Sequence, residues 1–316
     1  LIIKAKVLST FESRKRSREL NEKLIKLALI SAAAISILTT FGILFSILFE
    51  AIEFFKLRSF WYFITGATWS PGVIGSQFGA LPIFAGTFVI TIIALGVAIP
   101  VGLGSAIYMS EYASANIRDY LKPLLEILAG IPTVVYGFFA AITVAPLVVQ
   151  IAEFFGLEAT FNSALASGVV MGIMIIPVIS SLSDDVIRAV PDSQRKAAFA
   201  LGMTHGETIK NIVLPSAMPG IISASLLGLS KALGETMIVV MAAGLRPNLS
   251  WNPLEDMTTV TVTIVNSLVG DFEFNSPETL SAFALGLMLF IVTLILNMIS
   301  LSMIRKFKEK YKVNTL

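Results

Sequence analysis

The stretch SDDVIRAVPDSQRKAAFALGMTHGETIKNIVLPSAMPG, residues 183–220, decides how this chain is organised. It is polar and carries charges of both signs, and it leads into an apolar run that still contains Lys231 and Glu235, four residues apart. A charged connection joined to an apolar segment of membrane length suggests a device that links events on one side of a bilayer to a path across it.

The composition excludes most soluble and thiol-based classes of protein. Of the 316 residues, 55% are hydrophobic and only 14% are charged, and the mean hydropathy is +0.83. Soluble domains carry about a quarter charged residues, so a polytopic membrane protein is expected. The absence of cysteine excludes disulfides, zinc-thiolate sites and iron–sulfur clusters, and a net charge of +2 is too small to indicate nucleic-acid binding.

Six segments are long and apolar enough to cross a bilayer, which takes roughly 20 residues of α-helix. Lipid offers the backbone no hydrogen-bond partners, so these segments must be helices and the expected fold is all-α. We assign residues 27–304 to one membrane domain, which includes the polar connection 184–215, between a basic leader (1–26) and a basic tail (305–316). The six segments are Leu27–Phe49, Ile83–Ser110, Ile127–Gln150, Thr160–Ser183, Ser216–Leu245 and Thr279–Ile304.

The lysines and arginines orient these spans. With the N-terminus in the cytoplasm, every basic residue outside the fifth span except Lys56, Arg58 and Arg246 lies on the cytoplasmic side. Cytoplasmic loops carry the excess of positive charge, so both termini and residues 184–215 are expected there. The first span exceeds the roughly 7–15 apolar residues of a cleaved signal peptide, and we interpret it as an uncleaved signal anchor.

The spacing of residues within the polar connection resembles the EAA loop of ABC importer permeases. Lys196-Ala197-Ala198 is followed by Gly202 and later by Ile212–Pro215. In that family the loop folds into short coupling helices that sit in a groove of the ATP-binding subunit. The alanines give a slim docking face, Gly202 permits a sharp turn, and Pro215 is expected to end one helix before the next span begins. The family's leading glutamate is Lys196 here, which leaves any salt bridge assigned to that glutamate in question.

Seven residues of this loop are expected to take part in coupling to the ATP-binding subunit. Among them is the only histidine of the chain, for which we expect a polar contact at that interface and no catalytic role. They are Lys196, Ala197, Ala198, Gly202, His205, Leu214 and Pro215.

Four segments narrow the resemblance to the permease of the phosphate-specific ABC importer, PstC type, a binding-protein-dependent transport system inner-membrane component. The resemblance implies a type I-like permease fold in a prokaryotic cell (inner) membrane, a second six-helix permease subunit, two ATP-binding subunits and an extracytoplasmic phosphate-binding protein. The chain has no G-x-x-x-x-G-K-[ST] motif, so no cofactor is expected and ATP would be bound by the partners. The segments are FGALPIFAGT (78–87), LLEILAGIPTVVYGFFA (124–140), VPDSQRKAAFALGMT (190–204) and LSKALGETMIVVMAAG (229–244).

The charged pair in the fifth span is the expected meeting point with an anion. Charges inside a span are costly and usually face a bundle interior or an aqueous cavity. The i, i+4 spacing predicts Lys231 and Glu235 on one helix face, where the lysine attracts phosphate oxygens and the glutamate limits how tightly they are held. The alternative is an ion pair that only fixes helix packing. Thr236 and Ser230 are weaker candidates for the same substrate pathway.

Two further carboxylates, Asp184 and Asp185, follow the fourth span closely. We expect both of them at a solvated helix end.

Other functions stay open at this point. The permease of another oxyanion importer, for sulfate or molybdate, and the companion A-type phosphate permease are alternatives within the same class. An intramembrane enzyme is disfavoured by the single histidine, the lack of cysteine and the lack of an H-E-x-x-H motif. A stand-alone channel is disfavoured by the polar connection of docking type.

Overall fold

The structure is a computed structural model that describes residues 2–72, 75–269, 273 and 275–310, with side chains from residue 22 to residue 306 apart from the same gaps. Most of the expected basic leader and tail therefore lies outside the described side chains. The described part of the chain is mostly helical, and six of its helices are long and apolar enough to cross a membrane, in the order predicted. They are Glu22–Leu57, Leu81–Tyr112, Thr133–Phe154, Ala164–Arg188, His205–Leu233 and Pro277–Lys306.

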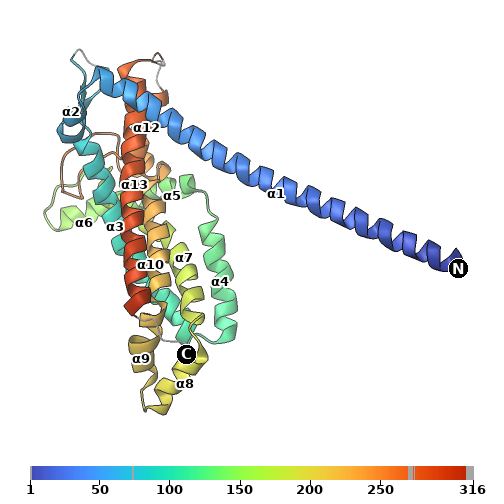
Figure 1. Ribbon diagram of the computed structural model, residues 1–316. Coiled ribbons are helices and arrows are strands. Elements are labelled where there is room, and N and C mark those ends of the chain that lie inside the picture. The colour runs from blue at the N-terminus through green and yellow to red at the C-terminus, as the bar shows by residue number, and fades with distance from the viewer. Residues whose placement is uncertain (1, 73–74, 270–272, 274, 311–316) are drawn as a thin grey trace.

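Four long helices run side by side and form the body of the molecule (Figure 1). Small residues bring the backbones of two of these helices together, because a Cβ at Gly172 would lie 2.8 Å from the Ala94 carbonyl oxygen and one at Gly168 would lie 2.7 Å from the Ile93 side chain. Close approach at glycine is the usual way in which membrane helices pack without a hydrophobic driving force. The four helices are α3 (Leu81–Ile107), α7 (Ala164–Arg188), α10 (Leu214–Leu233) and α13 (Pro277–Lys310).

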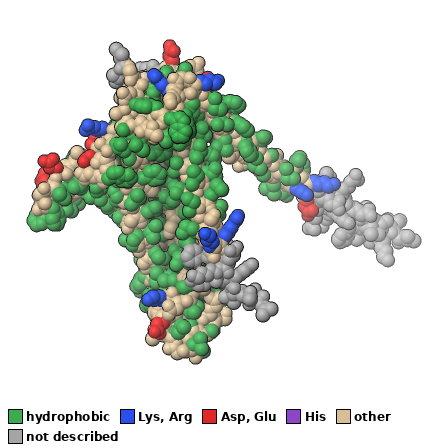
Figure 2. Space-filling model, turned by 60° about the vertical axis from the view of Figure 1, so that its left-hand side comes forward, with side chains coloured by type: hydrophobic (Ala, Val, Ile, Leu, Met, Phe, Trp, Pro, Cys, Tyr) green, Lys and Arg blue, Asp and Glu red, His purple; other side chains and the backbone are tan. Residues whose placement is uncertain are grey.

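Helix α1 (Ile2–Leu57) joins this body only at its C-terminal end (Figure 1). Ala51 and Phe54 are fully buried there, whereas side chains from Glu22 to Phe49 are mostly exposed. Figure 2 shows the apolar surface of this helix projecting away from the body. Apolar side chains in a membrane span need no protein cover, because lipid is as apolar as they are.

One end of the bundle is closed by an aromatic cluster. Helix α2 (Phe60–Thr65) and a two-stranded antiparallel hairpin, β1 (Trp69–Ser70) and β2 (Gln77–Phe78), lie over it. The rings of Phe54, Phe63, Trp69 and Phe78 meet edge to face at centroid distances of 5.4–6.4 Å. Aromatic pairs prefer this geometry, so the cluster fixes the hairpin against the bundle.

The third span begins later than predicted. The expected helix Ile127–Gln150 is interrupted at residues 130–132, and Ala115–Ala129 forms a separate helix, α4. Pro132 lacks a backbone N–H and disfavours helical geometry at the residue before it, which ends the helix there. Beyond the break, α5 (Thr133–Phe139), the π-helical turn η2 (Ala140–Val144) and α6 (Ala145–Phe154) run across the direction of the bundle in Figure 1.

The expectation that Pro215 ends a helix is wrong. Helix α9 (His205–Thr208), the π-helical turn η3 (Ile209–Val213) and α10 form one continuous helix through this proline. In the wider turn the Leu214 N–H bonds to the Ile209 carbonyl, five residues back. We infer that the wide turn lets the helix take up Pro215, which has no N–H to bond.

The fifth span is broken close to its expected charges. Helix α10 ends at Leu233, and a separate helix, α11 (Met237–Ala242), follows the residues Gly234 to Thr236. The chain then passes through a long connection to α12 (Val260–Val269) and into α13.

Candidate functional site

The polar connection folds into two short helices at the end of the bundle opposite the hairpin (Figure 1). Helix α8 (Asp192–Ala200) is followed by a turn at Gly202, which has φ +83°. This left-handed conformation favours glycine, so the predicted sharp turn is confirmed. Helix α9 then begins at a capping box, in which the Thr204 side chain accepts from the Glu207 N–H and the Glu207 carboxylate accepts from the Thr204 N–H.

The structure divides the seven expected coupling residues. Ala198 is buried and packs inward, and Leu214 and Pro215 are half-buried in the long helix. The remaining four are exposed on the connection, where a partner can reach them; they are Lys196, Ala197, Gly202 and His205.

Two exposed apolar residues of the same segment were not predicted. The exposed fraction is 45% for Phe199 and 80% for Leu201. Their signal in the sequence is that they are bulky apolar residues in an otherwise polar connection. Apolar side chains exposed beside polar ones are typical of a docking surface.

The connection is tied to the bundle by Arg195, which sequence reasoning also missed. Its guanidinium donates to the Glu111 carboxylate at 2.9 Å and to the Ile187 carbonyl at 3.0 Å, and it also contacts the Val190 carbonyl. Glu111 belongs to the π-helical turn η1 (Tyr108–Tyr112) that ends α3. One side chain thus joins α8 to the ends of α3 and α7.

A break in the fifth span separates Lys231 from Glu235, so the predicted shared helix face is wrong. Gly234 follows the last residue of α10, and Glu235 lies in the link to α11. The Glu235 carboxylate accepts hydrogen bonds from the backbone N–H groups of Met237 at 2.9 Å and Ile238 at 3.3 Å. Glu235 therefore holds the start of α11 and makes no ion pair with Lys231 among the described residues.

The backbone around this break is held by neighbouring helices. The Thr261 hydroxyl donates to the Glu235 carbonyl at 2.8 Å. On the other side Gly137 packs against α11, since a Cβ there would lie 2.8 Å from the Met241 sulfur and 3.1 Å from the Met237 carbonyl oxygen. These contacts fix the irregular backbone inside the protein, which is where a membrane protein tolerates it.

Lys231 is half-buried in the last turn of α10 and has no ion pair in the described part of the chain. An ammonium group in a span needs water, a carbonyl or an anion around it. The other two expected residues of the path differ in exposure, since Ser230 is exposed and Thr236 is half-buried. Lys231 is therefore the side chain of this set that is best suited to attract an anion.

Asp184 is not at a solvated helix end as expected. It is fully buried within α7, accepts from the Arg118 guanidinium at 2.9 Å, and lies 3.9 Å from the Lys122 ammonium. Lys122 also pairs with Asp185, which is half-exposed. Since α4 contains no buried residue of its own, these ion pairs hold it against α7.

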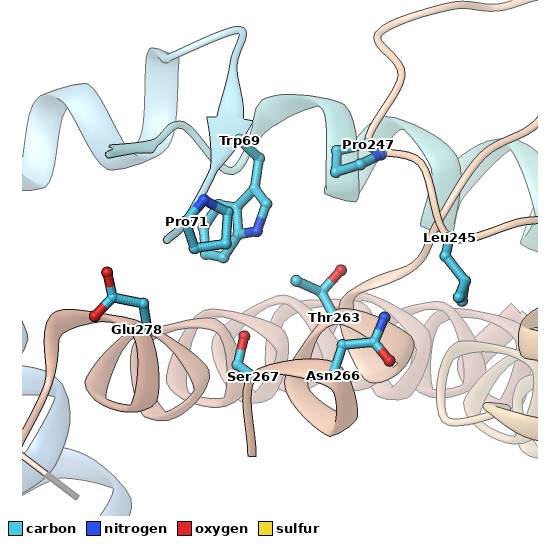
Figure 3. Close-up of a pocket in the computed structure, with 8 residues that line it drawn as sticks. All are labelled: Trp69, Pro71, Leu245, Pro247, Thr263, Asn266, Ser267 and Glu278. Carbon is cyan, nitrogen blue, oxygen red and sulfur yellow. The ribbon is translucent and has the colours of Figure 1, made fainter. Parts of the chain in front are cut away.

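A pocket of about 290 Å³ lies at the hairpin end of the bundle. Figure 3 shows the hairpin and the 245–247 connection on one side and α12 and α13 on the other. Its acidic group is Glu278, which disfavours an anion as the resident ligand. The lining residues are Trp69, Pro71, Leu245, Pro247, Thr263, Asn266, Ser267 and Glu278.

Six helices of membrane length in the described part of the chain and a polar two-helix segment at one end of the bundle fit a membrane-integral transport permease. The chain belongs to the family described as binding-protein-dependent transport system inner membrane component, whose pattern matches residues 98–312. That family consists of transport subunits, in agreement with the expectation of a non-catalytic chain.

Curated relatives match nearly the whole chain. The "Probable ABC transporter permease protein YqgH" of Bacillus subtilis is 31% identical and covers 95% of each chain. The "Phosphate transport system permease protein PstC" of Mesorhizobium japonicum is 33% identical and covers 87% of this chain and 88% of its own. The namesake protein of Xylella fastidiosa (strain Temecula1) is 32% identical over 90% of this chain and 91% of its own.

Solved structures confirm the fold of an ABC importer permease. A chain of an inward-facing MetNI methionine ABC transporter matches with a TM-score of 0.52 and 17% identity over 72% of this chain and 94% of its own. A chain of a bacterial ABC transporter that imports alginate matches with a TM-score of 0.55 and 14% identity over 84% and 96%.

Proposed function

We propose that this chain is a permease subunit of an ATP-driven phosphate importer and forms half of the path for inorganic phosphate. The observation that carries the proposal is the identity of about one third, over most of the chain, to permeases named for phosphate transport. The Lys231 ammonium lies beside the break in the fifth span and has no ion pair within the described residues. It supports the proposal, since a lysine attracts phosphate oxygens as a point charge.

The partners follow from this assignment. The second half of the path belongs to another six-helix permease, ATP is bound by two partner subunits on the cytoplasmic side, and an external binding protein delivers phosphate. The exposed face of α8 and α9 with Lys196, Phe199 and His205 is suited to contact the ATP-binding subunits, and this supports a cytoplasmic position for both termini. The hairpin end then faces the binding protein.

The fold suggests how motion reaches the path. Helix α9 continues without interruption into α10, and α10 ends two residues after Lys231. A displacement of α9 by the ATP-binding subunits is therefore carried along a stiff helix of 29 residues to the break at Gly234. The break allows α10 to move relative to α11, which is held by α5.

Uptake by the reconstituted complex tests the proposal. Proteoliposomes that contain both permeases and the ATP-binding subunits, with the binding protein outside, are expected to accumulate labelled phosphate only with ATP inside. Excess sulfate or molybdate should compete poorly. ATP-dependent uptake of sulfate or molybdate without phosphate uptake would instead assign the chain to another oxyanion importer.

A further inference from the structure

Glu111, at the end of α3, contacts both helices of the polar connection. Its side chain is only 6% exposed. One carboxylate oxygen accepts from Arg195 of α8 at 2.9 Å, and the other lies 3.9 Å from Nε2 of His205 at the start of α9. The His205 ring also packs edge to face on Tyr112, with centroids 5.2 Å apart. The end of α3 is thus attached to the connection at two points.

Arg195 fixes this attachment in a defined geometry. It is 16% exposed, and its planar fork of donors reaches Glu111 and the carbonyls of Ile187 and Val190 at once. A charge-assisted arginine–carboxylate bond is about twice as strong as a neutral one, and lysine cannot reproduce the fork. We name the Arg195 side chain, the Glu111 carboxylate and the Ile187 and Val190 carbonyls the Arg195 cluster.

The Arg195 cluster links α3 to the polar connection, to which α3 is not joined directly by the backbone. Helix α7 runs directly into α8, and α9 runs directly into α10, so these two spans are covalently joined to the connection. Helix α3 lies far away in the sequence and is joined to it by side chains alone. In the described residues the ion pair between Arg195 and Glu111, at 2.9 Å, is shorter than the contact of 3.9 Å between Glu111 and His205.

Helix α3 leads from the cluster to the opposite end of the molecule. Its 27 residues span about 40 Å. Near its start, a Cβ at Gly86 would lie 2.2 Å from the Thr258 carbonyl oxygen, and the Thr87 hydroxyl accepts from the Val260 N–H at 3.0 Å. A displacement of α3 at Glu111 therefore also moves residues 258–260, which lead into α12 at the hairpin end.

We propose that the Arg195–Glu111 pair is a positioning contact that makes α3 move together with α8 and α9, so that three spans rather than two respond to ATP. The pair acts through helix position and touches neither substrate nor nucleotide. This inference rests on the proposed importer function, because it assigns the route by which that function is driven.

Three variants of the full complex test it: Glu111→Gln, Arg195→Gln and the double variant. Each single variant is expected to lower the phosphate imported per ATP hydrolysed about three-fold or more, and the double variant should be no worse than the worse single one. A purely structural role would lower uptake and ATP hydrolysis together and leave their ratio unchanged. Asp119→Asn, which removes an exposed carboxylate of α4 at the same end, is the matched control and should keep the ratio of the wild type.

A distance measurement separates this inference from the importer proposal. The chain has no cysteine, so spin labels at Ala115→Cys and Ala200→Cys, both exposed, report only on the start of α4 beside α3 and on α8. We expect one narrow distance with and without ATP in the wild type, and a distance that broadens on ATP binding in Glu111→Gln. This result stands even if the wild-type complex imports another anion. An unchanged ratio of uptake to hydrolysis and an unchanged distance in assembled Glu111→Gln would overturn the inference.

Discussion

The two charges near the break in the fifth span have different tasks at the scale of single residues. Glu235 is 8% exposed and its carboxylate is used by the first N–H groups of α11, so its negative charge is already compensated by the backbone. Lys231 has no such partner in the described residues, so its charge is not compensated there. The helix break thus separates the two residues of the predicted ion pair. Glu235 stabilises the start of α11, whereas the charge of Lys231 stays uncompensated within the described residues.

Lys231→Gln is expected to abolish phosphate uptake by the complex, because it removes the ammonium and keeps a polar side chain of similar length. Lys231→Arg keeps the charge and should retain uptake. Labelled-phosphate uptake measures the effect, and co-purification of the partner subunits shows that the complex still assembles. Uptake at the wild-type rate by an assembled Lys231→Gln complex would exclude the role in the path.

At the scale of elements, the six spans could be predicted, but several of their ends and the shorter helices α2, α4 and α12 could not. Uninterrupted apolar runs predict the spans as helices, because in lipid the backbone N–H and C=O groups of such a run find hydrogen-bond partners only within a helix. The breaks at residues 130–132 and 234–236 depend on how neighbouring helices hold the freed backbone groups, as Thr261 does for Glu235. Pro215 shows the opposite error, since a π-helical turn allowed the helix to continue.

The candidate site was predictable to a similar degree. The spacing from Lys196 to Pro215 located the polar connection and its turn. The turn was predictable because a positive φ favours glycine, which can be recognised in the sequence. Arg195 and Glu111 are 84 residues apart, and only the packing of α3 beside α7 brings them together. The burial of Asp184 likewise depends on Arg118 of a helix that hydropathy does not identify as a span.

The turn between α8 and α9 makes a stability prediction at this scale. Gly202→Ala forces an L side chain into the left-handed region and is expected to destabilise the turn by about 1–2 kcal/mol. Gly206→Ala is the matched control, since Gly206 is helical, a Cβ there meets nothing within 4 Å, and alanine favours a helix. Hydrogen exchange of the amides of residues 196–208 in the assembled complex measures both changes. Equal protection in the two variants would contradict the prediction.

At the scale of the whole molecule, the two ends of the bundle differ in structure and in the charged residues that they carry. The end with α8 and α9 carries Arg118, Lys122, Arg188 and Arg195, while the hairpin end carries the acidic connection before α13. Parts of that connection are fixed to α7, because the Ala164 N–H bonds to the Glu255 carbonyl at 3.0 Å. Amide groups of Asn248 and Asn252 donate to the Glu255 carboxylate and lower its pKa, so the charged form is favoured there.

This division predicts the orientation of the chain in the membrane. The positive-inside bias predicts that α8 and α9 lie in the cytoplasm and that the link between α6 and α7 lies outside. Because the chain has no cysteine, Ala200→Cys and Glu158→Cys each provide one exposed thiol, on α8 and on that link. In intact cells a membrane-impermeant maleimide is expected to label Glu158→Cys and to spare Ala200→Cys until the membrane is opened. The reverse labelling pattern would indicate the opposite orientation in the membrane. The exposed face of α8 and α9 would then lie outside the cell, where no cytoplasmic ATP-binding subunit could contact it.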